Sequence, residues 1–118
     1  MNYEESKEFL NDLKKLLKKF PSLKDDLGIA KRAVIELRHI QEIDNQSVFQ
    51  ISGYTHKHFG FWKIKKFACK SLKGRGARSG IRIIYAFYPK ENKVVFLEIY
   101  FKGKKENEDK ERIKDYLK

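Results

Sequence analysis

The sequence predicts an α+β domain in which an N-terminal helical hairpin packs on a mainly antiparallel, twisted four-stranded sheet, followed by a short C-terminal helix. Three observations predict this class. Apolar residues recur at helical spacing up to about residue 40, alternate as in strands between residues 48 and 101, and become sparse in a highly charged C-terminal stretch. A chain of 118 residues has the length of one domain, so residues 1–118 are expected to form a single unit.

The first 40 residues are expected to form two antiparallel helices joined by a tight turn. The apolar positions of the first helix, expected over 3–20, are Phe9, Leu10, Leu13, Leu16, Leu17 and Phe20. Pro21 ends this helix, and Ser22 with Asp25 indicates a capping box at the start of the next. The second apolar stripe consists of Leu23, Leu27, Ala30, Val34, Leu37 and Ile40.

Four segments rich in β-branched and aromatic residues are then expected to be strands. They are Val48–Tyr54, Gly60–Lys70, Gly80–Tyr88 and Lys93–Phe101, with a turn at residues 89–92 between the last two. Alternation places Ile81, Ile83, Tyr85 and Phe87 on one face, and likewise Val95, Leu97, Ile99 and Phe101. A surface helix is expected over 106–118. Helices on one face would leave the other face of the sheet free to meet a partner.

Composition excludes several classes of protein. No run approaches eighteen apolar residues, and the N-terminus is neither a signal nor a transit peptide, so a cytoplasmic protein without a membrane segment is expected. Cys69 is the only cysteine, which excludes an internal disulfide and a cysteine-based zinc site and favours a buried, inert thiol. We expect no cofactor and no metal.

The positive charge is concentrated in the strand region. The net charge is +11 and the pI about 9.7, which points to a polyanionic partner. Residues 57–105 hold fourteen basic residues against two acids, a balance of +12, whereas the remainder holds thirteen against fourteen, a balance of −1. A lysine-rich surface of general adaptive origin would be spread over the helices too, so nucleic acid is the favoured partner.

The densest basic segment runs from residue 70 to residue 82. Gly74, Gly76 and Gly80 would let the backbone approach a phosphate, whose oxygens Lys73, Arg75 and Arg78 would also contact. The spacing is not that of a Walker loop, and its Gly-x-Gly is too weak to indicate a dinucleotide site. A mobile loop with solvated charges is the alternative.

Three segments resemble a known family. Trp62-Lys63-Ile64-Lys65, the run Lys70 to Tyr85 with its Ser79-Gly80-Ile81-Arg82 centre, and Ile99 to Asn107 resemble the RelE/ParE superfamily of toxin–antitoxin toxins. The order αα, sheet, α agrees with a RelE-like fold. The resemblance implies a toxin that cuts mRNA, free or on the ribosome, through attack of the substrate's own 2′-OH on the adjacent phosphate, without a metal.

The resemblance also implies residue roles. Arg82 matches the family's strand arginine beside the scissile phosphate, Lys73 and Arg75 match an upstream basic pair, and Lys105 stands where a further arginine is common. Fixed cations there would stabilise the charge that develops on phosphate oxygens. The structural alternative for Arg82 is an ion pair with Glu98. The expected RNA-binding residues are Lys63, Lys65, Lys70, Arg78, Lys102 and Lys104, of which Lys63 and Lys65 are alternates for the basic pair.

The sequence departs from the family in its acid–base group. No tyrosine or histidine lies between Lys105 and Glu111, and Tyr116 and Tyr100 are substitutes that more often serve packing. A His56/His58 pair beside Arg82 is conceivable as acid and base, although a solvated turn is the commoner role and a third zinc ligand is missing. Phe59, Phe61 and Trp62 would either stack on bases or fill the core.

Three functions remain open from the sequence. The first is a type II toxin with endoribonuclease activity, the second is a ParE-like toxin that poisons DNA gyrase by protein contact, and the third is a non-catalytic RNA-binding module. The basic cluster argues against the second. The first two imply a small acidic antitoxin as partner.

Overall fold

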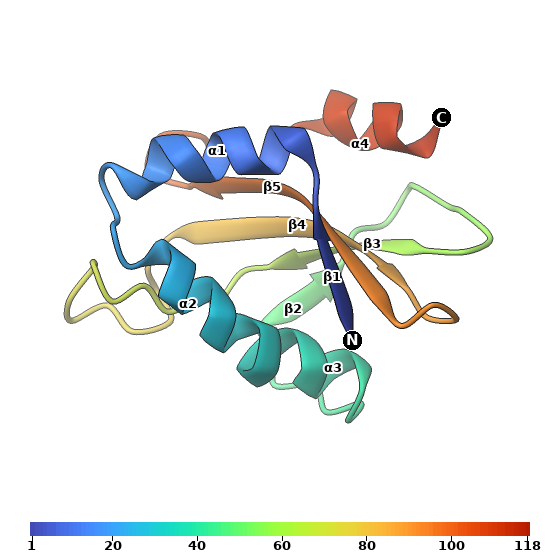
Figure 1. Ribbon diagram of the computed structural model, residues 1–118, viewed down its shortest axis with the longest axis horizontal. Helices are drawn as coiled ribbons and strands as arrows, with labels where there is room; N and C mark the ends of the chain where they lie inside the picture. Colours follow the sequence, from blue (N-terminus) through green and yellow to red (C-terminus); the bar gives the residue numbers. More distant parts are fainter.

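A five-stranded sheet forms the centre of the protein, and the helical hairpin covers one of its faces (Figure 1). The computed structural model describes residues 1–118, and its strand order is β1-β5-β4-β3-β2. The strands are β1 (Asn2–Glu5), β2 (Val48–Gln50), β3 (Gly60–Ile64), β4 (Ile81–Tyr88) and β5 (Lys93–Phe101). All pairings are antiparallel except β1 with β5. The α+β class is confirmed, but the expected strand count of four is wrong by one.

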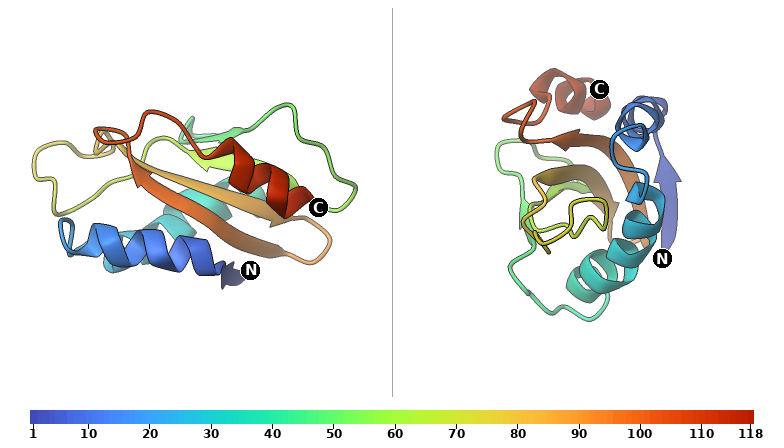
Figure 2. Two further views of the ribbon diagram at one scale, coloured as in Figure 1. Left: turned by 90° about the horizontal axis from the view of Figure 1, so that it is seen from above. Right: turned by 90° about the vertical axis from the view of Figure 1, so that its left-hand side faces the viewer.

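The helical hairpin and the C-terminal helix are confirmed. α1 (Lys7–Leu17) is followed by one long helical stretch made of α2 (Leu23–Ala30), the π-helix η1 (Lys31–Glu36) and α3 (Leu37–His39), and α4 (Lys110–Leu117) ends the chain. Figure 2 shows α1 and α2 lying against the same face of the sheet, with α4 beside α1 at the β5 edge. No helix is long and apolar enough to cross a membrane.

The extra strand β1 occupies residues that were expected to begin the first helix. Ser6 ends it, because its side chain accepts a hydrogen bond from the amide of Phe9 (3.1 Å) and caps α1 at that point. Tyr3 stacks on Phe96 of β5 with ring centroids 5.9 Å apart. A serine cap and an aromatic pair therefore outweigh the weak helical preference of the first five residues.

The π-turn rotates the inner face of the second helix. Each residue added by a π-turn shifts later side chains around the axis. Thus Ile35 is buried and His39 packs on the sheet, whereas Ile40, expected in the apolar stripe, is 50% exposed. The hydroxyl of Tyr3 donates to the Lys31 carbonyl (3.1 Å) and to Glu36 (2.7 Å), at the two ends of this turn.

Several element ends differ from expectation for local reasons. β2 stops at Gln50 because a turn follows in which Gly53 has a φ of 93°. β3 stops at Ile64 because the next two amides turn to the carbonyl of Ser47. α4 starts at Lys110, where Asp109 accepts from two helix amides at 3.1 and 3.2 Å. The expected capping box at Ser22 is wrong, since its hydroxyl donates to Asp26 instead (2.6 Å).

A bulge in β5 changes which residues share a face. The pairing moves from Ile84 with Glu98 to Tyr85 with Phe96, so Leu97 is the additional residue. Ile99 consequently packs in the core under the helices, while Leu97 packs on the opposite face. The expected uniform alternation along β5 is therefore wrong, although the two faces expected for β4 are confirmed.

The face away from the helical hairpin is only partly open. A second apolar cluster covers its centre, where Ile113 of α4 packs against Phe61, Ile84, Ala86 and Leu97. The end of the sheet that carries Arg82 lies outside this cluster. The expectation of a fully free face is thus wrong, and the accessible part is the end beside the basic loop, residues 70–80 (Figure 1, yellow).

His39 makes the stability of the fold depend on pH. Its Nε2 lies 2.7 Å from the Tyr85 hydroxyl, and its ring stacks on Phe87 at 4.0 Å. Burial and then the charge of Arg38 lower the pKa of His39 to about 4, from 6.5 ordinarily. Because the unfolded chain binds this proton first, we expect stability to be complete above pH 6.5 and to fall as the pH falls towards 4.

Urea unfolding at a series of pH values measures this effect. His39→Gln, which stays neutral and retains a hydrogen-bonding group for Tyr85, should flatten the wild-type slope between pH 6.5 and about 4. Identical pH profiles for the two proteins would show that another group causes the slope.

Candidate nucleic-acid interface

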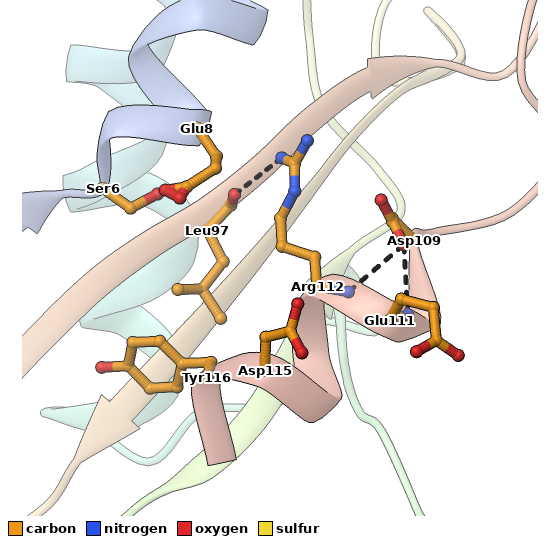
Figure 3. A pocket seen from close by; sticks show the side chains of 8 residues that line it. All are labelled: Ser6, Glu8, Leu97, Asp109, Glu111, Arg112, Asp115 and Tyr116. Atoms are coloured by element: carbon orange, nitrogen blue, oxygen red, sulfur yellow. Dashed lines mark hydrogen bonds between the residues drawn. The ribbon is translucent and has the colours of Figure 1, made fainter. Parts of the chain in front are cut away.

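The largest cavity is unsuited to phosphate. It has a volume of about 540 Å³ and lies between α1 and α4 (Figure 3). Its lining includes four carboxylates, from Glu8, Asp109, Glu111 and Asp115, and only one cation, Arg112. Arg112 is occupied by Asp12 (2.7 Å) and by the carbonyl of Leu97 (3.0 Å). This surface would repel a polyanion.

Two adjoining cavities at the Arg82 end of the sheet have the opposite character. They have volumes of about 420 and 190 Å³, and both are lined by Lys65, Arg82 and Lys102. The larger cavity holds no carboxylate, and the smaller holds Glu106 alone. We call their combined surface the Arg82 groove; its other lining residues are Phe49, Lys63, Lys66, Ala77, Arg78, Gly80 and Asn107.

Arg82 is oriented by backbone and keeps most of its donors free. β4 projects its side chain onto the face opposite the helical hairpin, and Nη1 donates to the carbonyls of Lys65 (2.8 Å) and Ile81 (3.4 Å). The expected alternative, an ion pair with Glu98, is not formed. The remaining N–H groups of the guanidinium are available to two oxygens of one phosphate.

Lys63 lines the groove but forms an ion pair with Glu108. Its ammonium group donates to Glu108 (2.7 Å), which precedes α4. Burial, the largest single effect, would lower the pKa of Lys63, but the interactions with Glu108 and Tyr100 together outweigh it, so the pKa of Lys63 lies above its ordinary value. Burial, again the largest single effect, would raise the pKa of Glu108, but the bond to Lys63, a backbone hydrogen bond and the charges of Lys63 and Lys110 together hold it below its ordinary value. Both groups are charged at neutral pH, and Lys63 offers phosphate less than a free cation would.

Lys105 is also paired, and it lines a different cavity. Its ammonium group donates to the buried carboxylate of Glu98, which also accepts from the amide of Asp109 (2.9 Å). Glu98 thus ties down the turn of residues 102–107. Lys104 and Lys105 line a cavity beside α1, on the other side of that turn.

Tyr100 lies next to these paired lysines. The ammonium groups of Lys63 and Lys105 are each 5.6 Å from its ring centroid, and its buried hydroxyl has no hydrogen-bond partner. Burial raises the pKa of Tyr100, although Lys63 opposes the shift. A hydroxyl with a raised pKa and no access to solvent is poorly suited to act as a base.

The basic loop is anchored at its base. Ser22, in the turn between α1 and α2, exchanges hydrogen bonds with Ser71 at 2.7 to 3.0 Å. Asp26, which is 3% exposed, accepts from the amide of Lys70 (3.1 Å). Phe67, Cys69 and Ser79 are buried beneath, as expected for the thiol. The tip is exposed, and positive φ angles of 81° and 56° favour glycine at positions 74 and 76.

The structure brings together five of the ten expected site residues. Lys63, Lys65, Arg78, Arg82 and Lys102 line the Arg82 groove. Lys70, Lys73 and Arg75 lie on the exposed loop and line neither of its cavities. The expected grouping of Arg82 with Lys73, Arg75 and Lys105 is therefore not what the fold assembles, because the anchored loop turns its tip away and Glu98 holds Lys105.

The other acid–base candidates lie far from Arg82. His56 stacks on Phe59 at 4.1 Å, and its Nδ1 accepts from the amide of His58 (3.0 Å). Tyr116 bonds to the hydroxyl of Tyr88. These groups gather at the opposite end of β4, so the conceived pairing of His56 and His58 with Arg82 is wrong. Among the aromatics, Phe61 is core and Trp62 packs on His39 (4.7 Å).

Two residues of the groove were missed from the sequence. Lys66 follows β3, and Phe49 lies on the edge strand β2, where its side chain is 40% exposed and has the ammonium group of Lys65 4.8 Å above its ring. A phenylalanine at the outward position of an edge strand is the signal that would have found it. An exposed aromatic ring beside cations can stack on a base.

The Phe101 ring packs between Gly80, at the end of the basic loop, and Gly103, in the turn of residues 102–107. This packing predicts the effect of a substitution at Gly103. A Cβ at Gly103 would lie 2.7 Å from the Phe101 ring, and one at Gly80 would lie 3.2 Å from it on another side. The ring also packs on Phe20 at 5.1 Å, so it has little room to move. We expect Gly103→Ala to destabilise the protein by ~1–3 kcal/mol, the usual cost of overpacking.

Thermal unfolding measures the loss. In a Phe101→Leu background the same substitution should cost much less, because the obstructing ring is absent and the two changes couple. Additive losses would contradict the proposed clash.

Comparisons with known proteins give one likeness. No protein-family model matches the chain, and a search of curated proteins finds no match. The chain is similar to a chain in the crystal structure of the archaeal RelE–RelB complex from Pyrococcus horikoshii OT3, with a TM-score of 0.47 and 15% sequence identity, over 86% of this chain and 94% of that chain.

Proposed function

We propose that this protein is the toxin of a type II toxin–antitoxin pair and acts in the cytoplasm as a metal-independent endoribonuclease on mRNA. The observation that carries the proposal is the Arg82 groove, in which four lysines and arginines surround Arg82 without a carboxylate in the larger cavity. An excess of fixed cations in a hollow beside an exposed aromatic ring is the arrangement that single-stranded RNA requires.

The chemistry needs only cations, water and the substrate itself. Attack of a ribose 2′-OH on the neighbouring phosphorus forms a new P–O bond and breaks the bond from phosphorus to the 5′-oxygen. The 2′-OH gives its proton to water and the leaving 5′-oxygen takes one from water, so the products carry a 2′,3′-cyclic phosphate and a 5′-OH. Negative charge grows on the non-bridging oxygens as the bond forms. Arg82 would hold two of those oxygens, and Lys65 and Lys102 would add charge without transferring a proton.

Cleavage by the purified protein tests the proposal. An RNA should be cut in the presence of EDTA, with ribosomes added in a parallel reaction, and the upstream product should end in a cyclic phosphate. The same RNA carrying a single 2′-deoxy residue at the cut position should stay intact there. Cleavage of the deoxy substrate at that position, or dependence on a divalent ion, would contradict the mechanism.

A second function, RNA binding without cleavage, is favoured by the pairing of two expected site residues with carboxylates. Lys63 is bound by Glu108 and Lys105 by Glu98, while the hydroxyl of Tyr100 is buried. This function predicts salt-dependent RNA binding and intact RNA at every protein concentration, with and without ribosomes.

We further propose a small acidic antitoxin as the partner. The net charge of +11 favours fast association with an acidic chain, and the unpaired outer edge of β2 can accept an added strand. Co-expression with the product of a neighbouring short acidic gene should restore growth, and the complex should bind RNA less tightly than the free toxin does.

A further inference from the structure

A second basic hollow lies on the other side of the turn formed by residues 102–107. It has a volume of about 390 Å³ and runs between the C-terminal half of α1 and the end of β5. We call it the α1 groove; it is lined by Asp12, Lys15, Leu16, Lys19, Phe20, Ile99, Tyr100, Phe101, Lys104 and Lys105. Nothing in the sequence pattern assigned Lys15 or Lys19 to a site.

The charges of the α1 groove favour an anionic occupant. Four lysines line it against one carboxylate, Asp12, which is occupied by Arg112 (2.7 Å) and by the amide of Ile99 (3.3 Å). Lys105 is bound by Glu98, so three ammonium groups, those of Lys15, Lys19 and Lys104, have no ion-pair partner. The groove therefore carries a net positive charge that the protein itself does not neutralise.

Its floor favours a planar ring. Phe20 and Phe101 meet edge to face at 5.1 Å, and Lys19 places its ammonium group 5.5 and 5.0 Å from their ring centroids. Half the lining residues are apolar. Phe20 is only 2% exposed and supports the half-buried Phe101, so Phe101 is the accessible ring. This ring below several cations suits a nucleotide, whose base rests on Phe101 while its phosphate contacts the lysines.

The two grooves share one turn. Lys102 lines the Arg82 groove, and Lys104, two residues on, lines the α1 groove. Gly80 and Gly103 both pack on Phe101, so the turn lies close to Ile81, where β4 begins. A strand that leaves the Arg82 groove across this turn meets the α1 groove next.

We propose that the α1 groove is a second nucleotide-binding site, which holds a neighbouring nucleotide of the same single RNA strand that occupies the Arg82 groove. The inference rests on the proposed function. It adds a subsite that is remote from the phosphate to be cut, and this subsite makes affinity depend on the length of the RNA.

The test compares two double variants of α1. Lys15→Ala/Lys19→Ala removes two lysines from the groove, and Lys14→Ala/Lys18→Ala removes two that do not line it. The dissociation constant for a long single-stranded RNA is measured at several salt concentrations, and for an oligonucleotide just long enough to fill the Arg82 groove. Circular dichroism verifies that both variants are folded.

We expect the salt slope for the long RNA to fall by about 1.4 in Lys15→Ala/Lys19→Ala, at ~0.7 per phosphate contact, and to change little in the control pair. Affinity for the short oligonucleotide should be equal in both. A photoreactive thiouridine in the long RNA should crosslink to a peptide containing Phe101.

If both double variants lose the same amount of affinity for the long RNA, overall charge explains the loss, and this result would overturn the inference. Unchanged RNA binding in Lys15→Ala/Lys19→Ala would also overturn it, and would leave the groove to an acidic protein segment. In both cases normal binding and cleavage by the wild type would leave the proposed function intact, whereas a wild type that binds no RNA would remove both.

Discussion

Arg82→Ala is expected to lower the rate of RNA cleavage by about a hundredfold or more, the usual consequence of removing one group that stabilises a developing oxyanion. The guanidinium is held by the carbonyl of Lys65 (2.8 Å), so its remaining donors are oriented before a substrate arrives. Expression of wild type and variant in growing cells, followed by mapping of RNA 5′ ends, measures the effect. Equal growth and intact messages with both proteins would end the nuclease hypothesis.

Two further variants test whether the loss of activity comes from the guanidinium of Arg82 or only from the loss of one positive charge. Arg82→Lys keeps the charge but loses the two-pronged geometry, so it should recover only a small part of the activity. Lys90→Ala removes one charge from the exposed turn at the other end of β4 and should leave cleavage unchanged. Since Arg82 is a half-buried residue with a single strong hydrogen bond, the unfolding temperature of Arg82→Ala should stay close to that of the wild type.

The sequence predicted the parts of the fold that depend on local pattern. Alternation in 81–88 and 93–101 predicted the central hairpin, and β5 begins and ends at the expected residues. The breaks in pattern were not predictable in this way. A bulge at Leu97 and a π-turn at Lys31 each insert one residue, and both are stabilised by contacts with distant segments, such as the Tyr3 hydroxyl on Lys31 (3.1 Å).

The sequence predicted several residues of the candidate site, but it did not predict which of them lie together in the fold. The motif centred on Arg82 predicted the end of the sheet at which the Arg82 groove lies. The β3–β4 pairing places Lys63 opposite Ile84, and Arg82 donates to the carbonyl of Lys65, so these three residues lie close together. The positions of Lys73, Arg75 and Lys105 depend instead on single buried acids. Asp26 holds the base of the basic loop, and Glu98 holds Lys105. Nothing in the local sequence distinguishes these two carboxylates from the acids on the surface.

The loop anchor leads to a second large effect, on Asp26→Ala. The carboxylate accepts from the hydroxyl of Ser22 (2.6 Å) and from the amide of Lys70 (3.1 Å) while only 3% exposed. Hydrogen bonds to a charged group contribute about 1.5–3 kcal/mol each, so we expect a loss of roughly 3 kcal/mol or more in the free energy of unfolding. Urea unfolding measures it.

The RNA affinity of Asp26→Ala tests the role of the loop anchor, because the change in charge should tighten binding and the loss of the anchor should weaken it. Losing one acid raises the net charge from +11 to +12, which by itself tightens RNA binding. Releasing the loop frees Arg78 from its place in the Arg82 groove, which weakens binding. Asp26→Asn makes the same change in charge but keeps an oxygen for both donors. We therefore expect Asp26→Ala to bind RNA more weakly than Asp26→Asn; tighter binding by both variants would mean that the loop contributes only its charge.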